Sequence, residues 1–234
     1  MTATERPSFL LVHGAWHGAW CWDAVRSALD ADGRRSHAVD LPSTDPSADP
    51  RGGSARAGMR DDAEVIRDSL RRIDGPVVVV AHSYGGVPST QAIADATNVT
   101  RAIYLAAFQL DVGESLLSFL GTPVPDDGTG RTPPDPNARQ VLFADVPEAD
   151  AERAVARLRP QSIRSFTEPV TTAGWRTVPS SYIVCDHDRA LAPSRQHELA
   201  TRAGSVHQLP SSHSPFLSMP RQLATLLARI APAG

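Results

Sequence analysis

Residues 77–86 constrain the fold of this chain more than any other segment. They read VVVVAHSYGG, so a run of β-branched residues stops at a serine flanked by small residues. Four consecutive valines are typical of a buried strand. Small residues two positions before and after a serine allow a strand to turn sharply into a helix, with the serine at the apex. Ala81 and Gly85 meet this requirement, although alanine replaces the more usual glycine. The segment predicts a strand, a strained turn and a helix, with Ser83 as a candidate nucleophile.

Ser83 has two interpretations that the segment alone does not separate. The hydroxyl could cap the N-terminus of an ordinary helix. It could instead attack a substrate, but a serine hydroxyl is unreactive at neutral pH without a base and an oxyanion site around it. The catalytic interpretation therefore predicts further parts elsewhere in the chain.

The composition narrows the class of protein. The chain has 234 residues, of which 41% are hydrophobic and 21% charged, as expected for one α/β domain that carries an insertion. A net charge of -3 gives no reason to expect nucleic acid or an anionic membrane as a partner. All 23 residues counted as lysine or arginine are arginines, so lysine Schiff-base chemistry is not available.

The two cysteines and the absence of a long apolar run indicate the cellular compartment in which the protein is expected. Cys21 and Cys185 cannot form a disulfide framework, which favours a reducing environment. The first residues lack the apolar core of a signal peptide, and no later run has the length of a membrane span. We therefore expect a cytoplasmic enzyme.

Strand-like and helix-like segments alternate along the chain, with one interruption. Strands are expected at residues 9–12, 36–39, 77–81, 102–106, 182–185 and 206–209, and helices at 22–29, 59–73, directly after Ser83, 194–202 and 220–231. Alternation of this kind predicts a parallel sheet with helices on both faces. From 109 to 179 the rhythm breaks, with one helix expected at 147–158, and residues 43–56 and 121–136 have the composition of loops. We expect a core of residues 1–108 and 180–234, with a cap inserted at 109–179.

The general base that would activate Ser83 is expected in a loop that follows the carboxyl end of a later strand. In open α/β sheets functional groups gather at the carboxyl ends of the strands, and in this arrangement the chain order is serine, acid, histidine. His213 lies in a loop after the last predicted strand, whereas His197 and His207 fall inside a helix and a strand. His213 is therefore the candidate base. Its alternative interpretation is a solvated loop histidine.

Three aspartates could orient that base. Asp186 and Asp188 both follow the fifth predicted strand, and Asp111 follows the fourth. The residues alone favour Asp188 only weakly over Asp186, and Asp111 less. A buried carboxylate at this place fixes the imidazole tautomer and stabilises its charged form.

The oxyanion site is expected from two backbone amides. One belongs to Tyr84, directly after the nucleophile, and the other to Ala15 in the loop after the first strand. His13 and His17 have the spacing of metal ligands on a helix, but His13 ends a strand and no carboxylate supports it. Gly14 lacks the partners of a dinucleotide fingerprint. We therefore expect no metal and no cofactor.

The chain resembles the α/β-hydrolase superfamily, and within it the small-esterase branch that includes plant methyl-ester hydrolases and hydroxynitrile lyases. The segments that carry the resemblance are 9–20 (FLLVHGAWHGAW), 81–86 (AHSYGG), 105–108 (LAAF), 182–185 (YIVC) and 212–213 (SH). The resemblance implies a mostly parallel six-stranded sheet in the order 2-1-3-4-5-6. It also favours Asp188 over Asp186, because that branch has an aspartate three residues after the cysteine. By the same resemblance Ser83, Asp188 and His213 would form a catalytic triad.

Two departures from the lyases bear on the reaction. Hydroxynitrile lyases of this branch carry a threonine where this chain has Gly14, and a lysine directly after the catalytic histidine, where this chain has Ser214. The residues that handle a cyanohydrin are therefore missing. Residues 160–170 look more like those of bacterial members than of the plant enzymes.

These observations predict a carboxylic ester hydrolase that acts on a small-to-medium neutral ester through an acyl-enzyme. The alternatives are non-hydrolytic acyl chemistry on the same triad, such as a cyclase, lactonase-type or lyase step, and a non-catalytic binding protein. The partner expected is a small-molecule ester; the sequence does not indicate an oligomeric state. The candidate pocket walls, of which about half are expected to reach the pocket and the others to belong to the core, are Trp16, Tyr84, Phe108, Phe119, Leu120, Phe143, Phe166, Trp175 and Phe216.

Overall fold

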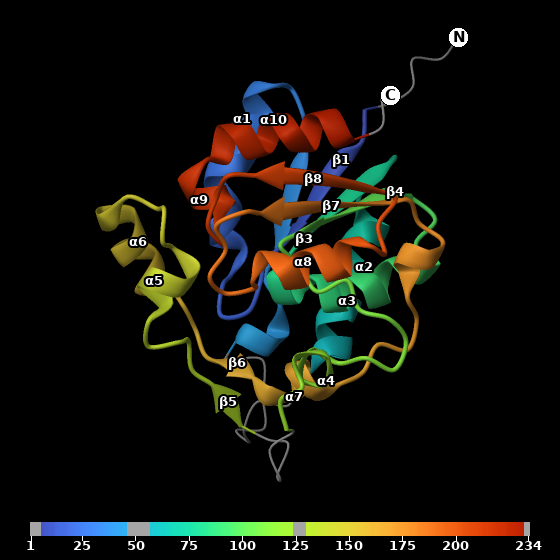
Figure 1. Ribbon diagram of the computed structural model, residues 1–234. Helices are drawn as coiled ribbons and strands as arrows, with labels where there is room; N and C mark the ends of the chain where they lie inside the picture. The colour runs from blue at the N-terminus through green and yellow to red at the C-terminus, as the bar shows by residue number, and fades with distance from the viewer. Residues whose placement is uncertain (1–5, 46–56, 124–129, 232–234) are drawn as a thin grey trace.

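A six-stranded parallel sheet forms the centre of the molecule. The computed structural model describes residues 6–45, 57–123 and 130–231, so most of the predicted loop at 43–56 and part of that at 121–136 lie outside the described residues. The strands of the sheet are β1 (Ser8–Val12), β2 (Ser36–Val39), β3 (Val77–His82), β4 (Val99–Leu105), β7 (Ser180–Cys185) and β8 (Ser205–Leu209). Their order is β2-β1-β3-β4-β7-β8 (Figure 1), which confirms the predicted fold and strand order.

The valines of β3 divide between the two faces of this sheet because successive side chains of a strand point to opposite sides. Val77 and Val79 pack with α2 (Met59–Arg72), α3 (Gly86–Ala92) and α8 (Pro193–Ala200). Val78 and Val80 pack with α1 (Asp23–Ala31) and α10 (Pro220–Ile230). A strand covered on both faces needs apolar residues at every position, which explains the unbroken valine run.

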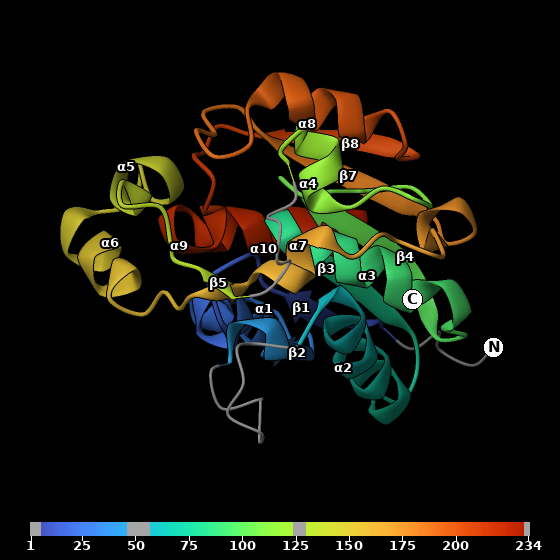
Figure 2. The same cartoon turned by 90° about the horizontal axis from the view of Figure 1, so that it is seen from below.

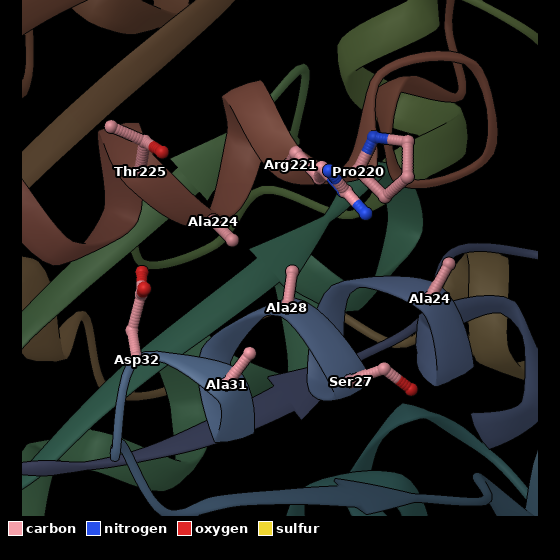
Figure 3. A pocket seen from close by; sticks show the side chains of 9 residues that line it. All are labelled: Ala24, Ser27, Ala28, Ala31, Asp32, Pro220, Arg221, Ala224 and Thr225. Carbon is pink, nitrogen blue, oxygen red and sulfur yellow. The ribbon is translucent and has the colours of Figure 1, made fainter.

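Helices α1 and α10 lie side by side on one face, and short side chains line their contact. Ala28 and Ala31 of α1 face Ala224 of α10 across a groove of about 600 Å³ (Figure 3). The groove also contains Ser27, but no histidine lines it among the described residues. It shares no lining residue with the cavity at Ser83 described below, so we do not connect it with catalysis.

Residues 109–179 follow β4 and add no strand to the six-stranded sheet. They include α4 (Leu116–Leu120), β5 (Arg131–Thr132), α5 (Ala138–Leu142), α6 (Glu148–Val155), β6 (Gln161–Ser162) and α7 (Ile163–Thr167). Helices α5 and α6 pack around a small core of their own, which includes Phe143. They stand apart from the sheet (Figure 2), on the side to which the arrowheads of β7 and β8 point (Figure 1).

Short helices complete the described chain. They are η1 (Ala19–Trp22), η2 (Pro42–Thr44), η4 (Ser83–Gly85), η5 (Ile93–Asp95), η6 (Gly174–Arg176) and α9 (Pro215–Ser218). Within the described ranges, no helix has both the length and the apolar character needed to cross a membrane.

Candidate active site

Ser83 lies at the strained turn between β3 and α3. Its φ is 50°, a left-handed value that is uncommon for a residue with a side chain. The turn brings backbones so close that a Cβ on Gly85 would lie 2.4 Å from the His13 carbonyl oxygen. A Cβ on Gly86 would lie 2.7 Å from the Phe108 carbonyl oxygen. The two glycines of the motif are therefore required by the close approach of the neighbouring strand ends.

Gly14 is confined in the same way, directly against the nucleophile. A Cβ at this position would lie 2.8 Å from both Nδ1 of His82 and Cβ of Ser83. Real Cβ atoms do not tolerate such contacts, so a larger residue would displace the turn that carries Ser83. A threonine at this position would meet the same obstacle.

We expect Gly14→Ala to shift the Ser83 turn and to lower both stability and turnover. Overpacking of this kind destabilises by about 1–3 kcal/mol. Thermal unfolding and kcat with a chromogenic ester measure the two effects. Gly204→Ala is the milder comparison, because its Cβ would lie 3.3 Å from the Ser180 carbonyl oxygen, a tight contact but a longer one than the 2.8 Å contacts at Gly14. An unchanged kcat and Tm in Gly14→Ala would contradict the close packing at the turn.

His213 and Asp188 form a buried hydrogen-bonded pair. The distance between Nδ1 of His213 and Oδ2 of Asp188 is 2.7 Å, and the carboxylate side chain is fully buried. Oδ1 of Asp188 accepts the amides of Ala190 and Leu191 at 2.7 and 3.0 Å. Its Oδ2 also accepts a hydrogen bond from the Gln196 side chain at 2.8 Å. Four donors thus fix the carboxylate and compensate its burial.

The other acids proposed from the sequence lie away from His213. Asp186 and its neighbour His187 are exposed after β7. Asp111 forms an ion pair with Arg176 at 2.6 Å, and the hydrogen bond from this guanidinium lowers the pKa of the aspartate. Among the three candidate aspartates, the structure brings Asp188 alone into contact with the imidazole.

Two side chains that the sequence did not single out hold the His213 loop. Nε2 of His82 lies 2.9 Å from the backbone oxygen of His213. Burial holds the pKa of His82 well below its ordinary value, so the ring is neutral and its Nε2–H donates to this carbonyl. Asp145, between α5 and α6, accepts hydrogen bonds from the amide and the hydroxyl of Ser212. The position of His82 next to Ser83 could have indicated a role for it near the nucleophile. No feature of the sequence indicated a role for Asp145.

Ala15 and Tyr84, whose amides are proposed for the oxyanion site, line the same cavity as Ser83 and His213. Tyr84 is the second residue of η4, so its amide belongs to the first turn and has no partner within the helix. Ala15 precedes Trp16, whose φ of 64° is again left-handed. The Trp16 amide donates to Oε1 of Gln161 at 3.2 Å, which fixes the loop next to Ala15.

A cavity of about 420 Å³ opens beside Ser83 and is lined mainly by apolar side chains. Its lining consists of Ala15, Trp16, Ser83, Tyr84, Phe108, Leu116, Leu117, Leu120, Thr122, Pro123, Thr132, Asp135, Val141, Leu142, Ile163, Phe166, Ala190, Leu191 and His213. Asp135 is the one carboxylate among these residues, and none of them is an arginine. The described lining therefore contains no arginine or lysine that could bind an anionic substrate.

Four of the aromatic residues predicted as pocket walls do not line the cavity, so the prediction is wrong for these four. Phe143 and Phe216 are fully buried and pack edge-on against His17. Trp175 donates its indole N–H to the Leu110 carbonyl oxygen at 2.8 Å. The ring of Phe119 packs against Phe108 and is covered by the Arg195 guanidinium. Their aromatic surface is used in packing, whereas Leu116, Leu117 and Leu120 reach the cavity.

The described residues contain no group of three or more His, Cys, Asp or Glu side chains arranged to hold a metal ion. His13 and His17 each bond to a backbone oxygen through Nδ1, at 2.8 Å. Burial lowers the pKa of His13 to about 4 and that of His17 to about 3, so both rings are neutral and serve the packing of the loop.

Comparison with known proteins identifies the family of the chain. The sequence profile of the alpha/beta hydrolase family matches residues 9–226. The chain belongs to this family. Family members share the elbow between β3 and α3 that carries Ser83 in this chain.

Several relatives carry names that indicate hydrolysis, and one of them is named as an esterase. A probable hydrolase, R7, from Phoma sp. (strain ATCC 20986 / MF5453) is 31% identical, with 97% of this chain and 98% of the relative covered. Methylesterase 1 from Arabidopsis thaliana is 28% identical, with 97% of each chain covered. A solved pyrethroid hydrolase from Sphingobium faniae JZ-2 is 27% identical, with a TM-score of 0.79 and 96% of this chain and 97% of that chain covered. These relatives support an ester-hydrolysing role.

Proposed function

We propose that the protein hydrolyses a neutral carboxylic ester through an acyl-enzyme on Ser83, with His213 as the base and Asp188 as its orienting acid. The observation that carries this proposal is the buried hydrogen bond between Nδ1 of His213 and Asp188, on the cavity that Ser83 lines. Because Nδ1–H donates to the carboxylate, Nε2 is left as the acceptor for a proton.

The reaction follows from these roles. Nε2 of His213 takes the proton of the Ser83 hydroxyl as Oγ attacks the ester carbonyl carbon. The tetrahedral intermediate collapses, the bond to the alcohol oxygen breaks, and His213 returns the proton to that oxygen. Water then attacks the acyl-enzyme with His213 again as base, which releases the acid and restores Ser83.

The developing oxyanion is held by the amides of Ala15 and Tyr84 in this proposal. Backbone donors held in place before the reaction stabilise negative charge without reorganising in the transition state. The buried Asp188 in turn stabilises the imidazolium that forms on His213. No step needs a cofactor, and all the proton transfers use groups of this chain.

The cavity supports a small-to-medium neutral ester as the substrate. Its volume of about 420 Å³ lies within the range of small-molecule sites. We propose residues 109–179 as a cap over it, because Leu116, Val141 and Phe166 from this segment line the cavity. An apolar wall favours acyl or alcohol groups of low polarity.

We expect hydrolysis of short aryl esters and no useful cleavage of mandelonitrile-type cyanohydrins. A leaving cyanide develops negative charge, which needs a nearby cation. The chain contains no lysine, and Arg221 of α10 lines the groove against α1 instead of this cavity. Both assays are run on one preparation of the enzyme.

Ser83→Ala is the blank in these assays. Enzyme-dependent cyanide release that exceeds ester turnover would overturn the hydrolase assignment. Slow ester turnover together with covalent labelling of Ser83 would indicate acyl chemistry other than hydrolysis.

A further inference from the structure

Asp62 is a buried carboxyl group that the proposed reaction does not use. It lies on α2 with no exposed surface. Its Oδ2 accepts the hydroxyls of Tyr84 and Ser43, each at 2.5 Å, and its Oδ1 accepts the Ser43 amide at 2.9 Å. These three partners, all described, are neutral donors. Burial of a carboxyl group without a cation is unfavourable, so the hydrogen bonds of Asp62 must compensate for the solvation that the group loses.

The hydrogen bonds of Asp62 continue into the loop after β1. Oγ of Ser43 accepts a hydrogen bond from Nε2 of Gln161 at 2.6 Å. Oε1 of the same Gln161 accepts the amide of Trp16 at 3.2 Å, and the whole glutamine side chain is buried. Asp62 is thus joined to Tyr84 directly, and to the residue after Ala15 through two intermediates. Tyr84 and Ala15 are the two residues that the proposed function assigns to the oxyanion.

We propose that Asp62 is a positioning residue that holds the two backbone segments of the oxyanion site in register. The inference rests on the proposed function, because it gives Asp62 a role only if the amides of Tyr84 and Ala15 hold an oxyanion. Donors of an oxyanion site act over tenths of an ångström, so the anchoring of their segments affects the transition state more than the bound substrate.

The ionisation of Asp62 changes what it can hold. Burial raises the pKa of Asp62 to about 7, so the carboxyl group is protonated below that pH and ionised above it. When ionised, Oδ2 accepts both hydroxyls. When protonated at Oδ2, it donates to one of these hydroxyl oxygens, and the hydrogen of that hydroxyl must point elsewhere. Among the described residues, the titratable groups that act on Asp62 are Tyr84 on η4, which burial keeps protonated by raising its pKa, and Asp61 on its own helix. Ser43 on η2 contributes only a hydroxyl and an amide.

Asp62→Asn tests this role because asparagine keeps the shape of the side chain but removes the carboxylate. Depending on the orientation of the amide, either an N–H₂ group or the one amide oxygen then occupies the position of Oδ2. We expect kcat for a chromogenic ester to fall by about 10–100-fold with KM nearly unchanged, somewhat less than the loss of a whole oxyanion donor. If the ionisation of Asp62 contributes to the dependence of kcat on pH, that contribution should be absent from the variant. Asp68→Asn is the matched control on the same helix, since the Asp68 side chain is 44% exposed and pairs with Arg71. It should leave kcat and its pH profile unchanged.

Tyr84→Phe provides a second variant that removes only the hydroxyl and keeps the ring and the backbone amide. It should lower kcat in the same direction, and the double variant with Asp62→Asn should lose less than the product of the two single losses, because both remove one hydrogen bond. Full multiplicativity would show that the two groups act independently. Tyr84→Phe also carries the test if Asp62→Asn does not fold.

The outcomes separate this inference from the proposed function. If Ser83→Ala is inactive while Asp62→Asn and Tyr84→Phe keep the parent kcat and pH profile, Asp62 has no positioning role and the hydrolase proposal stands. A lower Tm with an unchanged kcat per folded molecule would equally reduce Asp62 to a structural residue. If folded Ser83→Ala retains the parent activity, the proposed function itself fails.

Discussion

Ser83→Ala is expected to lower kcat by about 10³–10⁶-fold, because the nucleophile and its base act as a unit. The substitution deletes one oxygen and leaves Cβ in place, so the contacts that confine the turn at Gly85 and Gly86 remain. In the proposed mechanism no acyl-enzyme can form without Oγ, and only the oxyanion amides and substrate binding contribute to the remaining rate. The measurement is kcat with a short aryl ester on protein whose thermal unfolding matches that of the parent.

Ser89→Ala is the matched control for this experiment. Ser89 is buried on α3, a short distance along the chain from Ser83, and its Oγ has no hydrogen-bond partner among the described residues. Loss of an unpaired buried hydroxyl should leave both stability and kcat close to the parent values. A folded Ser83→Ala enzyme with near-normal kcat would remove Ser83 from the mechanism, whatever Ser89→Ala shows.

The sheet was predictable because its strands are buried on both faces. The valine run of β3 and the apolar run of β1 indicate buried strands, because segments with helical periodicity lie between them. Strand β4 begins at Val99, three residues before its predicted start at 102, because Thr100 and Arg101 interrupt the apolar pattern while the backbone ladder continues. Hydrogen bonding extends a strand beyond the residues that its burial reveals.

The interior of segment 109–179 was not predictable to the same extent. Helices α4, α5 and α7 have five residues each, and β5 and β6 have two, too few to show a period. Only α6, at Glu148–Val155, is long enough, and a helix was expected there at 147–158. The aromatic side chains of this segment could not be assigned to pocket or packing, because that choice depends on how short elements fold against the core.

The candidate residues that could be predicted are those whose position follows from the order of the strands along the chain. The choice between neighbouring residues within one turn could not be made in this way. Ser83 and His213 follow from the positions of strand ends. The choice between Asp186 and Asp188 depends on which side chain turns inward after β7, and the residues alone favoured Asp188 only weakly. Asp62 gave no signal at all. It follows Asp61 in a strongly charged helix, and such a pattern is typical of a solvated face.

Asp188→Asn is expected to lower kcat by about 10²–10⁴-fold, because the base loses control of its tautomer. The amides of Ala190 and Leu191 donate to Oδ1, so the asparagine oxygen will remain at that position. Its N–H₂ group then replaces Oδ2, where it faces Nδ1 of His213. This group donates to Nδ1 and thereby places the imidazole proton on Nε2, which can no longer accept the proton of Ser83.

Asp186→Asn is the control that separates the two neighbouring carboxylates. Asp186 is exposed, and its backbone amide donates to the Leu209 carbonyl oxygen at 3.0 Å, a bond that the substitution leaves intact. We expect its kcat to remain close to that of the parent. Both variants are measured at a pH well above the acid range, with thermal unfolding recorded for each. If Asp186→Asn loses more activity than Asp188→Asn, the carboxylate that orients the base is Asp186, and the loop after β7 must rearrange when substrate binds.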